Sequence, residues 1–196
     1  MAKAMSGQKP VTPSPDGIEA SVKAAKTRGS PPVHLWNPPF CGDLDINVAK
    51  DGSWSYLGSP INRFELVKLF SSILKKEDGK YYLVTPVEKV GITVEDVPFI
   101  AVDFEVEGSG EMQKLTFTTY VGDTAVAGAD HPLRIVIDTE TEEPAPYILV
   151  RANLEARIDR KSFYRLVDIA EHSGDWFGVW SDGQFFPLIR SDDLPD

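Results

Sequence analysis

Two stretches of the sequence begin alike, and each places an arginine where a helix is about to start. They read SPINRFELVKLF, residues 59–70, and ARIDRKSFYRLV, residues 156–167. Asn62 and Asp159 are good N-cap residues, so the pattern predicts helices whose first residues are Arg63 and Arg160. A cation at that position is disfavoured by about 0.3–1 kcal/mol because the helix dipole is positive there. Each arginine is therefore expected to have an anionic partner.

Two kinds of partner are open for these arginines. One is a protein carboxylate in a salt bridge, for which the candidates are Asp43, Asp45, Asp96 and Glu155. The other is a bound anion, because a guanidinium next to a helix N-terminus forms a good pair of phosphate ligands.

The loop TPVEK, residues 85–89, offers polar groups beside a rigid proline turn in the region that joins the two halves of the chain. It is either a hairpin turn with exposed charges, or a site in which Lys89 binds an anion and Thr85 donates a hydrogen bond. Glu88 belongs to the same loop. Arg151 and Glu155, on the strands before the second helix, have the same two alternatives. We hypothesise that Arg63, Lys89 and Arg151 contribute to one anion-binding cleft between the halves.

Asp43 and Asp45 alternate along a strand and therefore share one of its faces. That face is either solvated or a polar wall of the pocket, able to hold a ribose or a metal. A calcium loop is excluded, because Val48 stands where the loop needs glycine and Trp54 where it needs glutamate.

Other chemistries find little support in the sequence. The three histidines lack ligand spacing and there is one cysteine, so no zinc site is predicted. GSGE, residues 108–111, lacks the lysine and the following helix of a phosphate loop, and no nucleophile elbow occurs. We therefore predict no catalytic residues, no metal and no cofactor.

Charge and composition exclude further classes. The five basic and two acidic residues of 1–30 leave a net charge of +3 there, and −13 in the remainder of a chain with net charge −10. Such an acidic body repels a phosphate backbone, so nucleic-acid binding is not expected. The single cysteine, Cys41, suits a reducing compartment, and no apolar run has membrane-spanning length or the form of a signal peptide. We predict a soluble cytoplasmic protein without membrane contact.

The order of elements predicts an α+β fold in two small halves. Residues 1–32, rich in Pro, Ser, Lys and Ala, are expected to be a disordered tail. An α+β domain is predicted for 33–95 and a strand-rich α+β domain for 96–192. Asp51-Gly52 and Asp182-Gly183 predict hairpin turns, and the helical spacing over 63–74 predicts a helix that KEDGK, residues 76–80, closes. Strands and turns around the two helices repeat at an offset of 97 residues, which indicates a duplicated strand–helix–strand unit.

Several of these motifs together resemble a known family. CGDLDI, DGSWSYLGSPINR, YYLVTPVEKVGI, VEDVPF, HPL and PYILVRANLEARIDR are similar to the bacterial domain-of-unknown-function family 1285, over roughly residues 36–170. The resemblance implies a duplicated core and a C-terminal half superficially like pleckstrin-homology folds. It also implies a site between the two domains for a nucleotide-like ligand, and a role in signal transduction.

We therefore expect a non-catalytic regulatory or sensor protein that binds a small anionic, nucleotide-like ligand between its domains. The predicted binding residues are Asp43, Asp45, Arg63, Thr85, Glu88, Lys89, Arg151, Glu155 and Arg160. The alternatives are a protein-interaction adaptor that binds no small molecule, and a hydrolase of a phosphorylated metabolite. The identity of the ligand, the signalling partner and the oligomeric state do not follow from the sequence.

Overall fold

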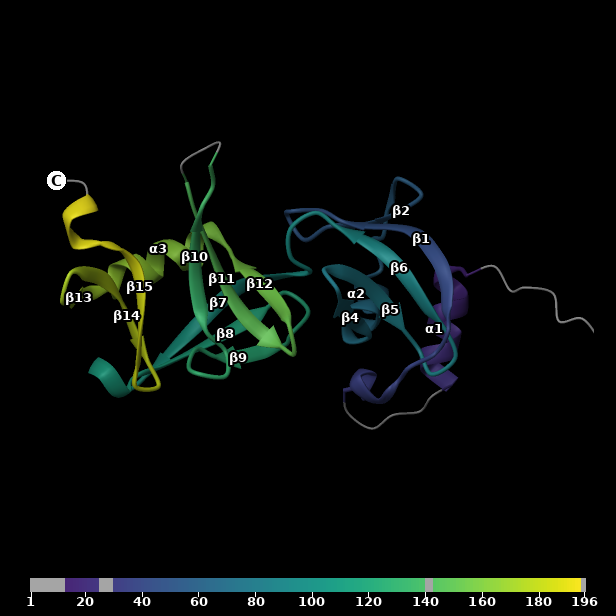
Figure 1. The fold of residues 1–196 in the computed structure, drawn as a ribbon, viewed down its shortest axis with the longest axis horizontal. Helices are drawn as coiled ribbons and strands as arrows, with labels where there is room; N and C mark the ends of the chain where they lie inside the picture. Colours follow the sequence, from purple (N-terminus) through teal and green to yellow (C-terminus); the bar gives the residue numbers. More distant parts are fainter. Residues whose placement is uncertain (1–12, 25–29, 140–142, 195–196) are drawn as a thin grey trace, which may run out of the picture. The chain divides into compact units, whose positions relative to one another are not determined.

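The computed structural model describes residues 13–24, 30–139 and 143–194 (Figure 1). The chain forms two compact units. The first unit comprises 1–47 and 55–93, and the second comprises 48–54 and 94–196. The fold is mixed α+β and has two parts, as predicted.

The first unit is built on one six-stranded sheet with the order β3-β2-β1-β6-β5-β4. Its strands are β1 (Phe40–Val48), β2 (Trp54–Tyr56), β3 (Ser59–Pro60), β4 (Leu74–Glu77), β5 (Lys80–Val84) and β6 (Lys89–Val94). Its helices are α1 (Pro15–Ala24), α2 (Phe64–Ser72) and the short 3₁₀ helix η1 (Val33–Leu35).

Alternating and helical spacing account for the core of this unit. On β1, Leu44 and Ile46 are buried while the residues between them are exposed, the alternation expected of a strand with one wet face. On α2, Leu66 and Phe70 are four residues apart and face the core, and Phe70 is fully buried.

The helix α2 is shorter than the sequence predicts. It ends at Ser72, and the segment KEDGK, expected to close it, instead forms the turn between β4 and β5. Asp78 and Gly79 both have positive φ there, which suits a tight hairpin turn. The apolar pair Ile73 and Leu74 fits either a last helical turn or a buried strand, so local spacing did not decide between them.

Part of the predicted disordered tail is helical. Residues 15–24 form α1, whose Ile18 and Val22 lie one turn apart and are buried. Two apolar residues at this spacing are a weak sequence signal, and tertiary packing supplies most of the stability of such a helix. The tail residues 1–12 and 25–29 lie outside the described residues.

The second unit contains a six-stranded sheet of order β10-β11-β12-β7-β8-β9 and a three-stranded sheet of order β13-β14-β15. The larger sheet consists of β7 (Phe99–Glu107), β8 (Lys114–Thr119), β9 (Thr124–Val126), β10 (Leu133–Ile137), β11 (Pro144–Arg151) and β12 (Leu154–Ile158). The smaller has β13 (Glu171–Ser173), β14 (Trp176–Ser181) and β15 (Gln184–Arg190). The helices are α3 (Arg160–Asp168) and the 3₁₀ turns η2 (Gly110–Met112) and η3 (Ser191–Asp193).

One pairing in the larger sheet is parallel. Strand β12 runs parallel to β7, with Ala156 opposite Phe99 and Arg157 opposite Ile100. The other pairings in this sheet are antiparallel. The parallel pairing places the end of β12, and so the start of α3, beside the beginning of β7.

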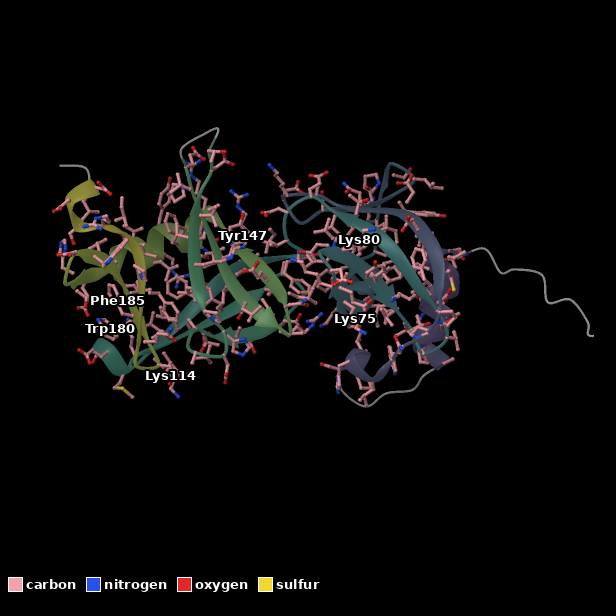
Figure 2. The ribbon with its side chains drawn as sticks, in the orientation of Figure 1. Lys75, Lys80, Lys114, Tyr147, Trp180 and Phe185 are labelled. Carbon is pink, nitrogen blue, oxygen red and sulfur yellow. The ribbon has the colours of Figure 1, made fainter. Side chains whose placement is uncertain are left out.

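A buried serine connects the two sheets of this unit. Ser181 on β14 is fully buried; its Oγ accepts a hydrogen bond from Leu115 N at 3.0 Å and donates one to Ala127 O at 2.7 Å. On the same pair of strands, Trp180 and Phe185 lie directly opposite each other with ring centroids 5.2 Å apart (Figure 2). The Ser181 contacts fix β14 against the larger sheet, and the aromatic pair packs β15 onto β14.

The hairpin turn predicted at Asp51-Gly52 is present, and it packs within the second unit. Gly52 has a φ of 85°, and a Cβ there would lie 2.7 Å from the Ile100 side chain, so both backbone and space require glycine. The indole nitrogen of Trp54 donates to the Tyr120 hydroxyl at 2.8 Å.

The two units share an order of elements but not a sheet arrangement. Helix α2 is followed by the antiparallel strands β4, β5 and β6, and α3 by β13, β14 and β15. In the first unit these strands belong to the six-stranded sheet, whereas in the second they form a sheet of their own.

Candidate functional site

The nine predicted binding residues divide between the two units. The first unit contains Asp43, Asp45, Arg63, Thr85, Glu88 and Lys89, and the second contains Arg151, Glu155 and Arg160.

Arg63 pairs with a carboxylate that the sequence analysis did not consider. Its guanidinium donates to Glu19 Oε1 of α1 at 2.8 Å. Arg63 is the N-cap residue of α2 and not its first helical residue, so the predicted cap by Asn62 is wrong. The first hydrogen bonds of the helix run from Leu66 N and Val67 N to Arg63 O, at 3.0 and 3.1 Å, so the helix starts one residue later than the capping pattern indicates.

Lys89 also has a protein partner. Its ammonium group lies 2.8 Å from Glu77 Oε2 and 5.0 Å from the centroid of the Tyr82 ring. The hydrogen bond that Lys89 donates to Glu77 raises the pKa of Lys89 above its ordinary value. Lys75 contacts the other oxygen of Glu77 at 2.8 Å, so one carboxylate serves two cations.

Thr85 and Glu88 make the proline turn rather than an open binding loop. Thr85 is fully buried, and its hydroxyl accepts hydrogen bonds from Val87 N at 3.3 Å and Glu88 N at 3.1 Å. The Glu88 carboxylate accepts a hydrogen bond from Ser21 of α1 at 3.3 Å. The turn alternative therefore describes the local structure.

Asp43 and Asp45 are exposed on one face of β1, as predicted from their alternation. The Asp43 carboxylate lies against Gly91 of the neighbouring β6, where a Cβ would overlap it. The Asp43 carboxylate thus occupies space that a side chain at residue 91 would fill.

Arg151 and Glu155 each have an oppositely charged partner in the second unit. The Arg151 guanidinium pairs with Asp123 and lies 4.8 Å from the centroid of the Phe99 ring. Glu155 accepts two hydrogen bonds from Arg134, at 2.6 and 2.8 Å, and these raise the pKa of Arg134. A two-point arginine–carboxylate contact is a strong form of ion pair.

Arg160 has a different environment. It is the first residue of α3, as predicted, and Asp159 is the N-cap, its Oδ1 accepting from Ser162 N at 2.8 Å. Arg160 Nε donates to the Tyr164 hydroxyl at 2.8 Å. This hydrogen bond uses one of the five N–H donors of the guanidinium, so the terminal nitrogens can also serve a ligand.

Arg160 lines a pocket of about 460 Å³ that lies wholly within the second unit. Its other basic lining residues are Lys50, from the hairpin turn, and Arg157, from β12. The acidic lining residues are Asp51, Glu143 and Asp159. Pockets of roughly 300–1,000 Å³ accommodate small molecules, so this cavity has the size of a ligand site.

Two of the three carboxylates are engaged in local structure. Asp51 accepts from Ser53 N at 2.9 Å and Ser53 Oγ at 2.6 Å, and these bonds hold the pKa of Asp51 below its ordinary value. Asp159 caps α3. Arg157 in turn lies 3.5 Å from Asp96, which does not line the pocket. The lining thus combines three cations with three carboxylates, of which Asp51 and Asp159 accept hydrogen bonds in their own segments, while the charge of Glu143 acts on Arg160.

The rest of the wall is apolar or aromatic. It consists of Ile100, Pro144, Pro146, Ile158, Phe163 and Tyr164. The Tyr164 ring is half exposed and lies 5.7 Å from the Arg160 guanidinium carbon. Such a wall can hold a flat ring next to a charged group.

Family models match nearly all of this architecture. The model described as the N-terminal domain of unknown function DUF1285 matches residues 31–97, and that described as the C-terminal domain of DUF1285 proteins matches residues 98–188. The chain belongs to the DUF1285 family.

Two crystal structures of DUF1285 proteins are similar to this chain. The one from Silicibacter pomeroyi DSS-3 is 61% identical, with a TM-score of 0.85, over 90% of this chain and 97% of that chain. The one from Shewanella baltica OS155 is 28% identical, with a TM-score of 0.50, over 64% of this chain and 91% of that chain. No curated protein matches the chain. The DUF1285 relatives are bacterial, and their descriptions give no activity.

Sequence reasoning missed most of the pocket in this DUF1285 protein. It named Arg160 but not Lys50, Arg157 or Tyr164. Tyr164 follows Arg160 by four residues, which places both on one face of α3 and could have been noticed. Lys50 had no such signal, because its position depends on the packing of a distant hairpin turn.

Metal-binding clusters and membrane-spanning helices are both absent from the described residues. No three or more His, Cys, Asp or Glu side chains in 13–24, 30–139 and 143–194 are grouped so that they could hold a metal ion. None of the helices in those ranges has the length and apolar character needed to cross a bilayer.

Proposed function

We propose that this protein is a non-catalytic regulatory or sensor protein whose second unit binds a small anionic, nucleotide-like molecule. The observation that supports the proposal is the position of Arg160, which lines a ligand-sized pocket and pairs with a tyrosine hydroxyl. The other predicted cations, Arg63, Lys89 and Arg151, pair with carboxylates.

The charge distribution favours an anionic group on the ligand. Lys50, Arg157 and Arg160 supply three positive charges from three separate segments. Asp51, Glu143 and Asp159 balance these charges formally, but Asp51 and Asp159 already accept hydrogen bonds from neighbouring residues, so the arginine N–H groups are the donors proposed for an anion. An arginine fork can hold a phosphate or carboxylate through two parallel hydrogen bonds.

The apolar wall favours a ring attached to that group. Pro144 and Pro146 alternate along β11, and the ring of Phe163 completes the wall with Tyr164. An exposed aromatic ring stacks readily on a flat base. A molecule that joins an anionic group to a planar base would use both parts of the pocket.

Ligand binding can be tested by thermal unfolding of the full chain. The probes are nucleoside monophosphates, the matching nucleosides and inorganic phosphate. Binding to the folded state alone stabilises by about 2.7 kcal/mol at 100 times Kd, so a nucleotide that binds should raise Tm. The nucleoside and phosphate alone should raise it less.

Two variants make the test specific for the pocket. Arg160→Gln should abolish the nucleotide-dependent shift. Lys161→Gln, an exposed neighbour that does not line the pocket, should keep it. If no probe raises Tm, or if both variants respond like the unmodified chain, this site does not bind such ligands.

The remaining parts of the proposal rest on the sequence analysis. They are the role in signal transduction and the cytoplasmic location. A ligand site between the halves stays a separate prediction, because the pocket proposed here lies within the second unit. The duplication of the strand–helix–strand unit and the pleckstrin-homology-like character of the C-terminal half also stay predictions. The adaptor and the hydrolase remain the alternative functions, and incubation with the same nucleotides, followed by product analysis, separates the hydrolase from a binding protein.

A further inference from the structure

The first helix contacts its unit through one narrow face. Ile18 is fully buried and Val22 is 6% exposed, one turn apart, while Asp16, Ala20 and Lys23 on the other faces are exposed. The helix packs against α2. An apolar pair at this spacing is the feature by which a short amphipathic helix docks onto a surface.

Polar contacts flank this apolar pair. Glu19 Oε1 accepts from Arg63 at 2.8 Å and from Lys23 at 2.6 Å, and these bonds hold the pKa of Glu19 below its ordinary value. Ser21 Oγ donates to Glu88 Oε1 at 3.3 Å. The helix α1 thus supplies a carboxylate to Arg63 and a donor to Glu88.

The helical state of α1 depends on this docking. The segment has ten residues and includes Gly17, and isolated helices of this length and composition are marginal in water. It also lies outside the matched family models, which begin at residue 31. The helix is therefore a separate segment held by a small set of contacts of its own.

We propose that the surface beneath α1 is a helix-docking surface from which α1 can detach, and that the α1 of a second copy of the chain can occupy it. The α1 of a second copy fits this surface because it has the same apolar pair and the same carboxylate for Arg63. Exchange of an identical element between copies needs no new interface chemistry. The proposal is independent of the pocket in the second unit.

The experiment uses the full chain and a fluorescent peptide of residues 13–24. In the unmodified chain the surface is occupied by its own α1. The substitution Ile18→Asp in the chain places a carboxylate in a buried apolar position and so releases that helix. The peptide should then bind the Ile18→Asp chain at least about ten-fold more tightly than the unmodified chain, because an intramolecular competitor has been removed.

Three variants and one hydrogen-exchange measurement serve as controls. A peptide that carries Ile18→Asp should not bind, and a Glu19→Gln peptide should bind more weakly. Adding Arg63→Gln to the Ile18→Asp chain should weaken binding of the unmodified peptide but not of the Glu19→Gln peptide. Hydrogen exchange of the Ile18→Asp chain should show loss of protection in 15–24 and unchanged protection in α2.

The opposite results overturn the proposal. If Ile18→Asp removes protection from α2 and the sheet as well, α1 is an integral part of the core and not a detachable helix. If the peptide binds both chains equally, or binds regardless of its own Ile18, the surface does not recognise α1.

Discussion

Gly178 on β14 lies opposite Pro187 on β15, at a bulge in the antiparallel pair. Phe177 faces Ile189 and Gly178 faces Pro187, so Leu188 is the extra residue on β15. A Cβ on residue 178 would come within 2.9 Å of the Pro187 Cα and would overlap the carbonyl oxygen of Phe186. The two backbones approach this closely because position 178 has no side chain.

Gly178→Ala should therefore lower the free energy of unfolding by about 3 kcal/mol or more, since backbone atoms cannot turn away as a side chain can. Gly174→Ala is the control in the same unit. Gly174 has a φ of 59° and nothing within 4 Å of an added Cβ, so this substitution should cost about 1–2 kcal/mol. Urea unfolding of both variants measures the difference, and equal losses would contradict the overlap.

The N-cap of α3 gives a second prediction. Asp159→Ala removes the acceptor for Ser162 N and should cost about 1 kcal/mol. Asp159→Asn keeps an acceptor and should cost less.

Asn62→Ala should cost only a few tenths of a kcal/mol, roughly the effect of an ordinary surface substitution, because Arg63 and not Asn62 is the N-cap of α2. A loss of about 1 kcal/mol for Asn62→Ala in urea unfolding would indicate that Asn62 caps α2, as the sequence pattern predicts.

The free energy of unfolding should fall at alkaline pH because Tyr147 ionises. Burial raises the pKa of Tyr147 above 10.0, and the neighbouring Asp96, which accepts a hydrogen bond from the phenol at 3.0 Å, raises it further. A raised folded-state pKa means that this contribution to stability is complete below the ordinary tyrosine pKa and is lost as pH rises through the folded value. Spectroscopic titration should show a late-titrating tyrosine signal that is lost in Tyr147→Phe and kept in Tyr164→Phe.

The stability of the first unit should fall at acid pH because Glu77 becomes protonated. Hydrogen bonds from Lys75 and then Lys89 hold the pKa of Glu77 below 4.5. A lowered folded-state pKa means that this stabilisation is present above the ordinary glutamate pKa and is lost as pH falls through the folded value. Urea midpoints of Glu77→Gln should therefore change less between neutral and acid pH than those of the unmodified chain. Glu65→Gln, on the exposed side of α2, is the matched control and should retain the full acid response.

Local patterns in the sequence predicted local structure well. Asp159 and Ser162 are three residues apart, so the cap of α3 follows from spacing, and the turns at Asp51-Gly52 and Asp182-Gly183 follow from residue type. The start of α2 was misplaced by one residue because Asn62 and Arg63 both precede a plausible first turn. In the structure, the hydrogen bond from Val67 N to Arg63 O identifies Arg63 as the N-cap.

Partners across long sequence distances were not predictable in the same way. Arg63 pairs with Glu19, 44 residues earlier, in a segment whose helix depends on docking. Lys50 and residues of α3 line the same pocket because the hairpin turn packs there. No periodic pattern in the sequence indicates that these two segments lie together. Four carboxylates were weighed as partners for Arg63, and none of them was the partner observed.

The parallel pairing of β7 with β12 affects how the chain is made. Phe99 and Ala156 are 57 residues apart, so the centre of the larger sheet cannot close until the intervening strands have left the ribosome. A hairpin such as that of β7 and β8 can form as soon as both strands emerge. Closing a long loop costs chain entropy and therefore slows folding. Residues 48–54 are synthesised well before Ile100 and Tyr120, the residues they contact in the second unit. The slow step in biogenesis is therefore expected to be the closure of the second unit, after the first unit has been fully translated.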